Sequence, residues 1–425
     1  MKKNLLPIAL AAIFGFNAYS QQDNDRVRFV DTDKDIVIFQ IMEENGPQHQ
    51  KFRNTPRFTL VGKDNKFYLG VGANLKFVAD YDWGNPLSNP NEFAPAAIPF
   101  DTKPGDGGKT QFSIGQSNFY LNFVALPGNE NQLGIYIDIN FLGADAKAVA
   151  LHHAYLKYRG ITAGYVVSTF TDLGADPVAI DFAGPNAITF VRHPNISYTQ
   201  KFGKDKMWSA ALGIDMPDKY SITASSSTRA VNQRMPDIPL YLQRSWAAGK
   251  GWLRFSAIFR DLIYRDDMSN KNVGAFGWGV KLSGKSPICG GLSALWQAVY
   301  GKGVSSYIQD LSGLGLDLVP CQGNNGKLET IKSWGAYGTL RYDFCPKVFM
   351  DVTYSQVRAY APKFTNSTTS WDGIYKYGQY VTANLFWNIN SFTQFGVEYL
   401  WGRRVNLDGM QRHDNRIMAM LQIGI

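Results

Sequence analysis

From Lys66 to the C-terminus, the chain repeatedly alternates apolar and polar residues with a period of two. In the first stretch of this kind, the apolar residues are Phe67, Leu69, Val71, Ala73, Leu75 and Phe77, and the intervening ones are Tyr68, Gly70, Gly72, Asn74 and Lys76. A period of two is the side-chain period of a β-strand, and about 16 such stretches follow one another. We therefore predict an all-β chain whose strands have one apolar face and one face in water.

The connections between the predicted strands alternate between short turns and long loops. The short ones, such as Arg159–Gly160 and Cys345–Pro346, contain residues that suit tight reversals. The long ones cover residues 81–110, 170–187, 216–235, 301–330 and 361–375. Short periplasmic turns opposite long extracellular loops are typical of a transmembrane antiparallel β-barrel of about 16 strands.

The N-terminus predicts export. Lys2 and Lys3 precede an apolar run, and Ala18-Tyr19-Ser20 resembles a signal-peptidase site before Gln21. We assign residues 1–20 to a signal peptide, residues 21–56 to a periplasmic N-terminal segment and residues 57–425 to the barrel. The apolar run near Ile36 to Met42 suggests either a plug at the barrel base, a contact with another subunit, or a partly ordered arm.

Composition and charge exclude several other classes of protein. The net charge is +8, and loss of Lys2 and Lys3 leaves +6, with the basic residues scattered. Nucleic-acid binding is therefore disfavoured. No mature segment offers 18 uninterrupted apolar residues, which excludes a helical membrane protein. The 14% aromatic content fits the aromatic girdles of a barrel in the outer membrane of a Gram-negative bacterium better than a secreted sandwich.

The final strand has the same alternation. Its outer residues are Ile417, Ala419, Leu421, Ile423 and Ile425. Such a strand resembles the signal that barrel-assembly machinery reads, although those signals usually end in Phe. The expected surroundings of the barrel are outer-membrane lipid and lipopolysaccharide.

Alternation also predicts which charged side chains face the lumen. The basic ones are Lys76, Lys157, Arg254, Arg260, Arg341 and Arg404, and the acidic ones are Asp138, Asp215, Asp343, Asp351 and Glu398. Cations opposite carboxylates would create a transverse field that selects small ions. The alternative is that these charges only solvate a wide channel or pair with neighbouring strands.

The loop at residues 170–187 is the third connection on the extracellular side, counting a shorter one near residues 143–149, and it is acidic and rich in turn residues. Asp172, Asp176 and Asp181 are its carboxylates, and Arg192 follows it directly. We select these four residues as candidates for the pore constriction.

The residues around this loop carry a family resemblance. The runs are His153-Ala154-Tyr155, Ser168-Thr169-Phe170-Thr171-Asp172, Asp181-Phe182-Ala183-Gly184-Pro185 and Arg192-His193-Pro194, followed by Ile196 and Tyr198. Together they resemble the DcaP-type porins, which are trimeric outer-membrane channels. Val167 replaces the family's usual Trp, and residues 21–53 show no sustained heptads of a coiled coil.

The resemblance implies a 16-stranded homotrimeric porin that passes small anionic solutes such as dicarboxylates. It also implies that the third loop folds inward as a constriction, with lumen arginines opposite. Two alternatives stay open: a plugged or closed barrel that acts as an adhesin or assembly component, and a sugar-selective porin. No cofactor is expected.

The sequence offers no catalytic or metal-binding pattern. His152 and His153 are consecutive on a predicted strand, so they should point to opposite faces and cannot share one site unless that strand is irregular. We therefore expect neither enzyme activity nor a metal site. Cys289 and Cys345 fall in predicted periplasmic turns and form the one disulfide pairing that the topology allows, while Cys321 lies at the opposite end.

Overall fold

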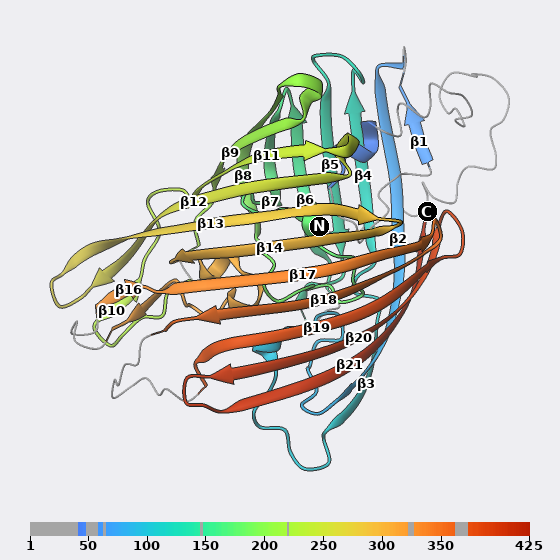
Figure 1. The fold of residues 1–425 in the computed structure, drawn as a ribbon. Helices are drawn as coiled ribbons and strands as arrows, with labels where there is room; N and C mark the ends of the chain where they lie inside the picture. Colours follow the sequence, from blue (N-terminus) through green and yellow to red (C-terminus); the bar gives the residue numbers. More distant parts are fainter. Residues whose placement is uncertain are drawn as a thin grey trace, which may run out of the picture.

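In a computed structural model, the wall of the molecule is one antiparallel sheet (Figure 1). The sheet closes on itself because β2 (Phe67–Trp83) pairs with β21 (Gln411–Gly424). The structure describes residues 41–47, 58–62, 65–144, 148–218, 221–321, 327–361 and 373–425. It is a closed barrel of 16 strands, which confirms the predicted fold class and strand number. The predicted signal peptide, residues 1–20, lies outside the described residues.

The wall strands follow one another in chain order. Between β2 and β21 lie β3 (Gly108–Ser113) with β4 (Asn118–Ala125), β5 (Leu133–Asn140), β6 (Ala150–Tyr158), β7 (Ile161–Val167), β8 (Arg192–Phe202), β9 (Trp208–Asp215), β11 (Ile238–Trp246), β12 (Gly251–Asp266), β13 (Lys271–Cys289), β14 (Leu292–Lys302), β17 (Lys332–Cys345), β18 (Val348–Ala359), β19 (Tyr375–Asn388) and β20 (Thr393–Asn406). Because β3 and β4 both pair with β2, they make one interrupted wall strand.

Four short strands lie outside this series. They are β1 (Phe58–Val61), which pairs with β2; β10 (Thr228–Ala230), which pairs with β12; and β15 (Leu318–Pro320) with β16 (Leu328–Thr330), which pair with each other. None of the helices in the described part of the chain is long and apolar enough to cross a membrane.

The predicted phase of the strands is confirmed in β2. On its outer face, Phe67 and Phe77 are 48% and 47% exposed, whereas Lys76 between them in the pattern is 1% exposed. In β21, Ile417 and Leu421 are exposed on the outside and Arg416 is buried inside. The outward rows therefore present an apolar band, and the inward rows carry polar groups.

We call the end of the barrel with the tight connections the turn end and the opposite end the loop end. Arg159 and Gly160 join β6 to β7 with φ values of 46° and 83°, the two positive values that a type I′ hairpin requires. At the loop end, three long connections, residues 84–107, 168–191 and 303–317, turn into the barrel. Their buried apolar residues, among them Phe93, Ile180 and Ile308, form interior clusters with wall residues.

The wall is uneven in height (Figure 1). Strands β5, β6 and β7 have 8, 9 and 7 residues, whereas β12 and β13 have 16 and 19. The short strands lie next to the start of residues 168–191, the third connection at the loop end, which we call the third loop.

The predicted disulfide is not formed, because all three cysteines are free. Cys289 ends β13 and Cys345 ends β17, and β14 lies between these two strands. Two strand spacings amount to roughly 10 Å, whereas a disulfide needs Cα atoms within about 7 Å.

Candidate functional site

The third loop crosses the lumen and is fixed to the far wall by its backbone. The amides of Ile180 and Asp181 each donate a hydrogen bond of 2.9 Å to the Glu398 carboxylate of β20. The amide of Val178 donates to Asp351 of β18 at 3.0 Å. These bonds satisfy buried N–H groups that have no strand partner. The loop can therefore lie in the interior without the free-energy cost of unpaired backbone donors.

The predicted constriction residue Asp172 lies at the start of this loop and is 2% exposed. Its carboxylate accepts hydrogen bonds from Ser283 Oγ at 2.7 Å and Trp252 Nε1 at 3.1 Å, and Arg254 Nη1 lies 3.4 Å away. Burial disfavours the ionised form, but the positive charges of Arg254 and Lys281 outweigh it and hold the pKa of Asp172 below its usual value. Asp172 therefore binds the loop to β12 and β13.

Asp176 and Asp181 are also buried among wall and loop groups. Tyr337 Oη of β17 donates to Asp176 Oδ1 at 3.2 Å. Tyr380 Oη of β19 donates to Asp181 Oδ2 at 2.9 Å, and the amide of Phe93 donates to Asp181 Oδ1 at the same distance. Phe93 belongs to the first long loop, so Asp181 also connects two loops inside the barrel.

The six predicted lumen cations all contact segments or carboxylates on the inner side of the wall. Five of them donate to backbone carbonyl groups of segments inside the barrel: Lys76 to Ile180, Lys157 to Glu44, Arg254 to Thr171, Arg260 to Gly303 and Arg404 to Ala96. Nε of Arg341 lies 3.3 Å from the Asp343 carboxylate and 3.9 Å from the Asp351 carboxylate. The basic side chains thus support the lumen segments as well as charging the interior.

Arg260 is the centre of a buried ionic network. Its Nε donates to Asp237 Oδ2 at 2.9 Å and its Nη1 to Asp317 Oδ2 at 2.6 Å. Tyr307 Oη donates to the same Asp237 oxygen at 2.9 Å. Arg260 is 2% exposed, so water cannot solvate its charge, and the two carboxylates balance that charge instead.

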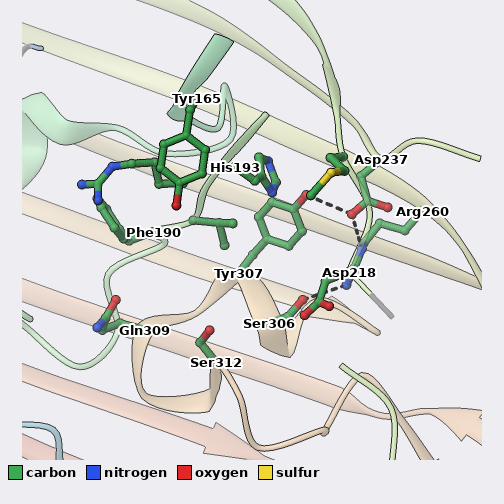
Figure 2. Close-up of a pocket in the computed structure, with 13 residues that line it drawn as sticks. Tyr165, Phe190, His193, Asp218, Asp237, Arg260, Ser306, Tyr307, Gln309 and Ser312 are labelled. Atoms are coloured by element: carbon green, nitrogen blue, oxygen red, sulfur yellow. Dashed lines mark hydrogen bonds and ion pairs between the residues drawn. The ribbon is translucent and has the colours of Figure 1, made fainter. Parts of the chain in front are cut away.

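A cavity of about 320 Å³ lies beside this network, between the end of the third loop, β7, β8, β12 and the loop that follows β14 (Figure 2). Figure 2 shows Tyr307 between His193 and Arg260, with its hydroxyl group turned to Asp237. Arg192 also lines the cavity, and its guanidinium group stacks on Phe190 with 5.1 Å to the ring centroid. Within the described residues, Arg192 has no carboxylate within ion-pair distance.

Two inward cations were missing from the predicted set of lumen cations. Lys281 of β13 is 1% exposed and donates to the carbonyl group of Phe170 and to Thr189. Arg416 of β21 is fully buried and forms an ion pair with Asp82. The alternation in β13 and β21 places both side chains inside, and this signal could have found them.

The N-terminal segment at residues 41–47 occupies the lumen at the turn end. Asn45 and Asn122 of β4 form a side-chain hydrogen bond of 2.7 Å, and Asn122 also donates to the Met42 carbonyl group at 2.7 Å. Tyr155 Oη donates to the Asn45 carbonyl group at 2.8 Å. A Cβ atom at Gly134 would lie 1.9 Å from Asn45 Oδ1, so the glycine makes room for this segment.

The prediction that His152 and His153 point to opposite faces is wrong. Asp138 pairs with His153 but the next residue, Ile139, pairs with Leu151, so His152 is the extra residue of a β-bulge. Such a bulge turns two consecutive side chains to one side of the sheet. His152 and His153 are 3% and 1% exposed, and their ring centroids lie 4.3 Å apart.

Asp310 lies in the loop after β14 and connects that loop to other segments inside the barrel. Its carboxylate accepts hydrogen bonds from the Ala96 amide at 2.8 Å, from Asn186 Nδ2 at 3.4 Å and from the Tyr375 hydroxyl group. Burial raises the pKa of Asp310 to about 6. The first loop, the third loop and the loop after β14 therefore meet at one titratable group.

No protein-family model matches the chain, and no curated protein matches its sequence. The crystal structure of the outer membrane channel DcaP of Acinetobacter baumannii is similar, with a TM-score of 0.70 and 18% identity, over 86% of this chain and 99% of that chain. An anion-selective porin from Comamonas acidovorans has a TM-score of 0.54 and 10% identity, over 85% of this chain and 100% of that chain. OmpT, an outer membrane protein of Vibrio cholerae, has a TM-score of 0.53 and 10% identity, over 86% of this chain and 100% of that chain.

These comparisons confirm the resemblance to the DcaP channel that the third-loop residues predicted. At such identities the likeness establishes the fold, which is that of outer-membrane channels.

Proposed function

We propose that this chain is an outer-membrane porin through which small polar solutes diffuse passively, with a preference for anions such as dicarboxylates. The fold shared with outer-membrane channels supports passage across that membrane. The anion preference rests on one observation: Arg192 lines the cavity at the end of the third loop without an ion pair in the described part of the chain.

The other charges near the cavity support the same preference. The Asp237 carboxylate is bound by Arg260 and Tyr307, and the third-loop carboxylates Asp172 and Asp181 are turned to wall and loop partners. A carboxylate that is already hydrogen-bonded and ion-paired attracts a passing cation less than an isolated one. Arg192 can then attract an anion whose charge it complements.

We place the constriction at the third loop, in the part that crosses the lumen between Asp172 and Arg192. Its backbone is held by Glu398, Asp351 and the hydroxyl group of Ser355, which the Ala187 amide contacts at 3.1 Å. A segment with several fixed backbone contacts narrows a pore to a defined width.

We also propose that the protein assembles as a homotrimer through the wall of short strands. The 7 residues of β7 span roughly 23 Å along the strand, and a tilt of about 40° reduces this to about 18 Å. The apolar band of an outer-membrane barrel is about 25 Å tall. Contact with neighbouring protomers would cover the shortfall on this side.

Conductance and selectivity of the purified protein in planar lipid bilayers test the function. We expect stepwise channels and a zero-current potential that shows chloride permeating faster than potassium. Arg192→Gln should lower the chloride-to-potassium permeability ratio. Arg244→Gln, an exposed arginine on the outward face of β11, should leave it unchanged. Potassium preference in the unmodified protein would refute the anion part of the proposal.

A plugged barrel is the second candidate function, and the docking of residues 41–47 inside the turn end favours it. A barrel closed in this way would serve as an adhesin or assembly component through its external loops. It predicts no conductance until the segment leaves. A sugar-selective porin would instead show faster flux of neutral sugars than of dicarboxylates into liposomes.

A further inference from the structure

The β-bulge in β6 brings three potential metal ligands together. Asp138 Oδ2 lies 2.7 Å from His152 Nδ1, and Asp138 Oδ1 lies 2.9 Å from His153 Nδ1. One donor atom from each of the three residues lies within 4.8 Å of the other two. A regular strand could not do this, because one of the two imidazoles would face the lipid.

The donor set suits a particular class of ion. Two imidazole nitrogens and one carboxylate oxygen are typical ligands of Zn²⁺ and neighbouring divalent transition metals, and they leave a coordination position open. Tetrahedral ligands at about 2.0–2.1 Å from Zn²⁺ lie roughly 3.3 Å apart. The two carboxylate–imidazole separations, 2.7 and 2.9 Å, are shorter than this value by about half an ångström, so modest side-chain rotations would open the site to an ion.

A second observation points to a ligand at this place. His153 is 1% exposed, and its Nε2 has no hydrogen-bond partner among the residues that the structure describes. A buried ring nitrogen without a partner is costly. Coordination through Nε2 would satisfy this nitrogen while Nδ1 keeps its hydrogen bond to Asp138, and coordination through Nδ1 would bring the Asp138 carboxylate into the same ligand set. The neighbouring groups are a neutral aromatic wall: Phe182 of the third loop lies 5.9 Å from the His152 ring, and Tyr136 lies 6.3 Å from the His153 ring.

One charge opposes a cation here. The Arg192 guanidinium group interacts electrostatically with Asp138 and with both imidazoles. It should weaken the binding of a divalent ion, and this gives the site a distinctive response to mutation.

We propose that Asp138, His152 and His153 form a binding site for one divalent transition-metal ion of the Zn²⁺ class on the lumen side of β5 and β6. The site holds the ion through the paired imidazoles and the shared carboxylate. It also places the ion beside the third loop, through Phe182.

Calorimetric titration of the untagged, detergent-solubilised, chelator-treated protein with Zn²⁺ tests the site, and Co²⁺ absorption in the visible range reports its coordination. We expect one ion per chain and tetrahedral Co²⁺ bands. His153→Gln and the nearly isosteric Asp138→Asn should each weaken binding roughly 10- to 100-fold. His193→Gln is the matched control, because His193 is a buried histidine with a single carboxylate partner, Asp215, at 3.0 Å.

Arg192→Gln supplies the opposite test. Removal of the neighbouring positive charge should strengthen Zn²⁺ binding roughly threefold or more. Heat-modifiable electrophoretic mobility shows which variants keep the folded barrel. The proposal is overturned if the folded unmodified protein binds neither ion, or if His153→Gln and Asp138→Asn bind as tightly as His193→Gln.

Discussion

Glu398 offers the sharpest test of how the third loop is held. Its carboxylate accepts the amides of Ile180 and Asp181 at 2.9 Å each, and Asn384 Nδ2 at 3.0 Å. All of these groups are buried. Glu398→Ala removes the acceptor and leaves two loop N–H groups without a partner.

The expected cost follows from these two amides. A buried donor that loses its partner costs about 1 to 3 kcal/mol, and two donors give about 2 to 6 kcal/mol. Relief of the repulsion between the Glu398 and Asp181 carboxylates offsets part of this loss. We therefore expect about 2 to 4 kcal/mol, which corresponds to roughly 30- to 1,000-fold faster local opening.

Hydrogen exchange with mass spectrometry on the peptide that covers residues 178–182 measures this opening, and bilayer recordings should show larger open-channel current noise. Asp343→Ala is the control, since Asp343 lies on the wall and pairs with Arg341 at the turn end. If exchange in this peptide stays unchanged in a folded Glu398→Ala barrel, the loop is not held by these bonds and the reasoning fails.

Three other changes probe the lumen segments. Gly134→Leu should expel Asn45 and its segment and raise single-channel conductance, whereas Gly338→Leu, with open space around its Cβ position, should not. Because burial raises the pKa of Asp310 to about 6 from 3.8, the folded protein binds this proton more tightly than the unfolded chain does, so the loop junction is most stable at low pH and weakens as pH rises through 6. Current noise should increase between about pH 4 and pH 6 and level off above it, and Asp310→Asn should abolish that increase. Arg254→Gln should raise exchange in the third loop while changing ion selectivity less than Arg192→Gln does, because Arg254 already has loop partners.

The strand register could be predicted because it depends on local alternation alone. In β2 and β21, an apolar residue every second position decides which face meets lipid, and a slip by one residue would expose Lys76 or Arg416 to it. Lipid and water on opposite faces leave only one acceptable phase.

The bulge in β6 could not be predicted by that rule, since one extra residue changes the face of everything before it. Strict alternation from Leu156 would place His152 in lipid and Leu151 in the lumen. A histidine in lipid and a leucine in the lumen are both unfavourable, and this conflict indicated that the strand is irregular. The bulge resolves the conflict, since Leu151 is 49% exposed on the outer face and His152 is 3% exposed inside. A polar residue on the apolar face of a barrel strand is therefore a reason to expect a bulge.

The partners of the interior charges could not be predicted either, because they come from distant parts of the chain. The amide of Ile180 and its acceptor Glu398 are 218 positions apart, and Arg404 binds a carbonyl group 308 positions away. Alternation gives the side of the wall on which a charge lies, but the inward-folded loops decide whether it stays available to a solute.

This distinction changes how selectivity should be read from a barrel sequence. A count of inward cations treats Arg254, Arg260 and Arg192 as equal, although the first two have a carboxylate within ion-pair distance and the third has none at that distance in the described residues. A paired charge creates a short-range dipole, whereas an unpaired one retains its field across a pore of several ångströms. The preference for anions should therefore depend on the few arginines that the loops leave without an ion pair, and a substitution that frees Arg254 from Asp172 should add one more such group.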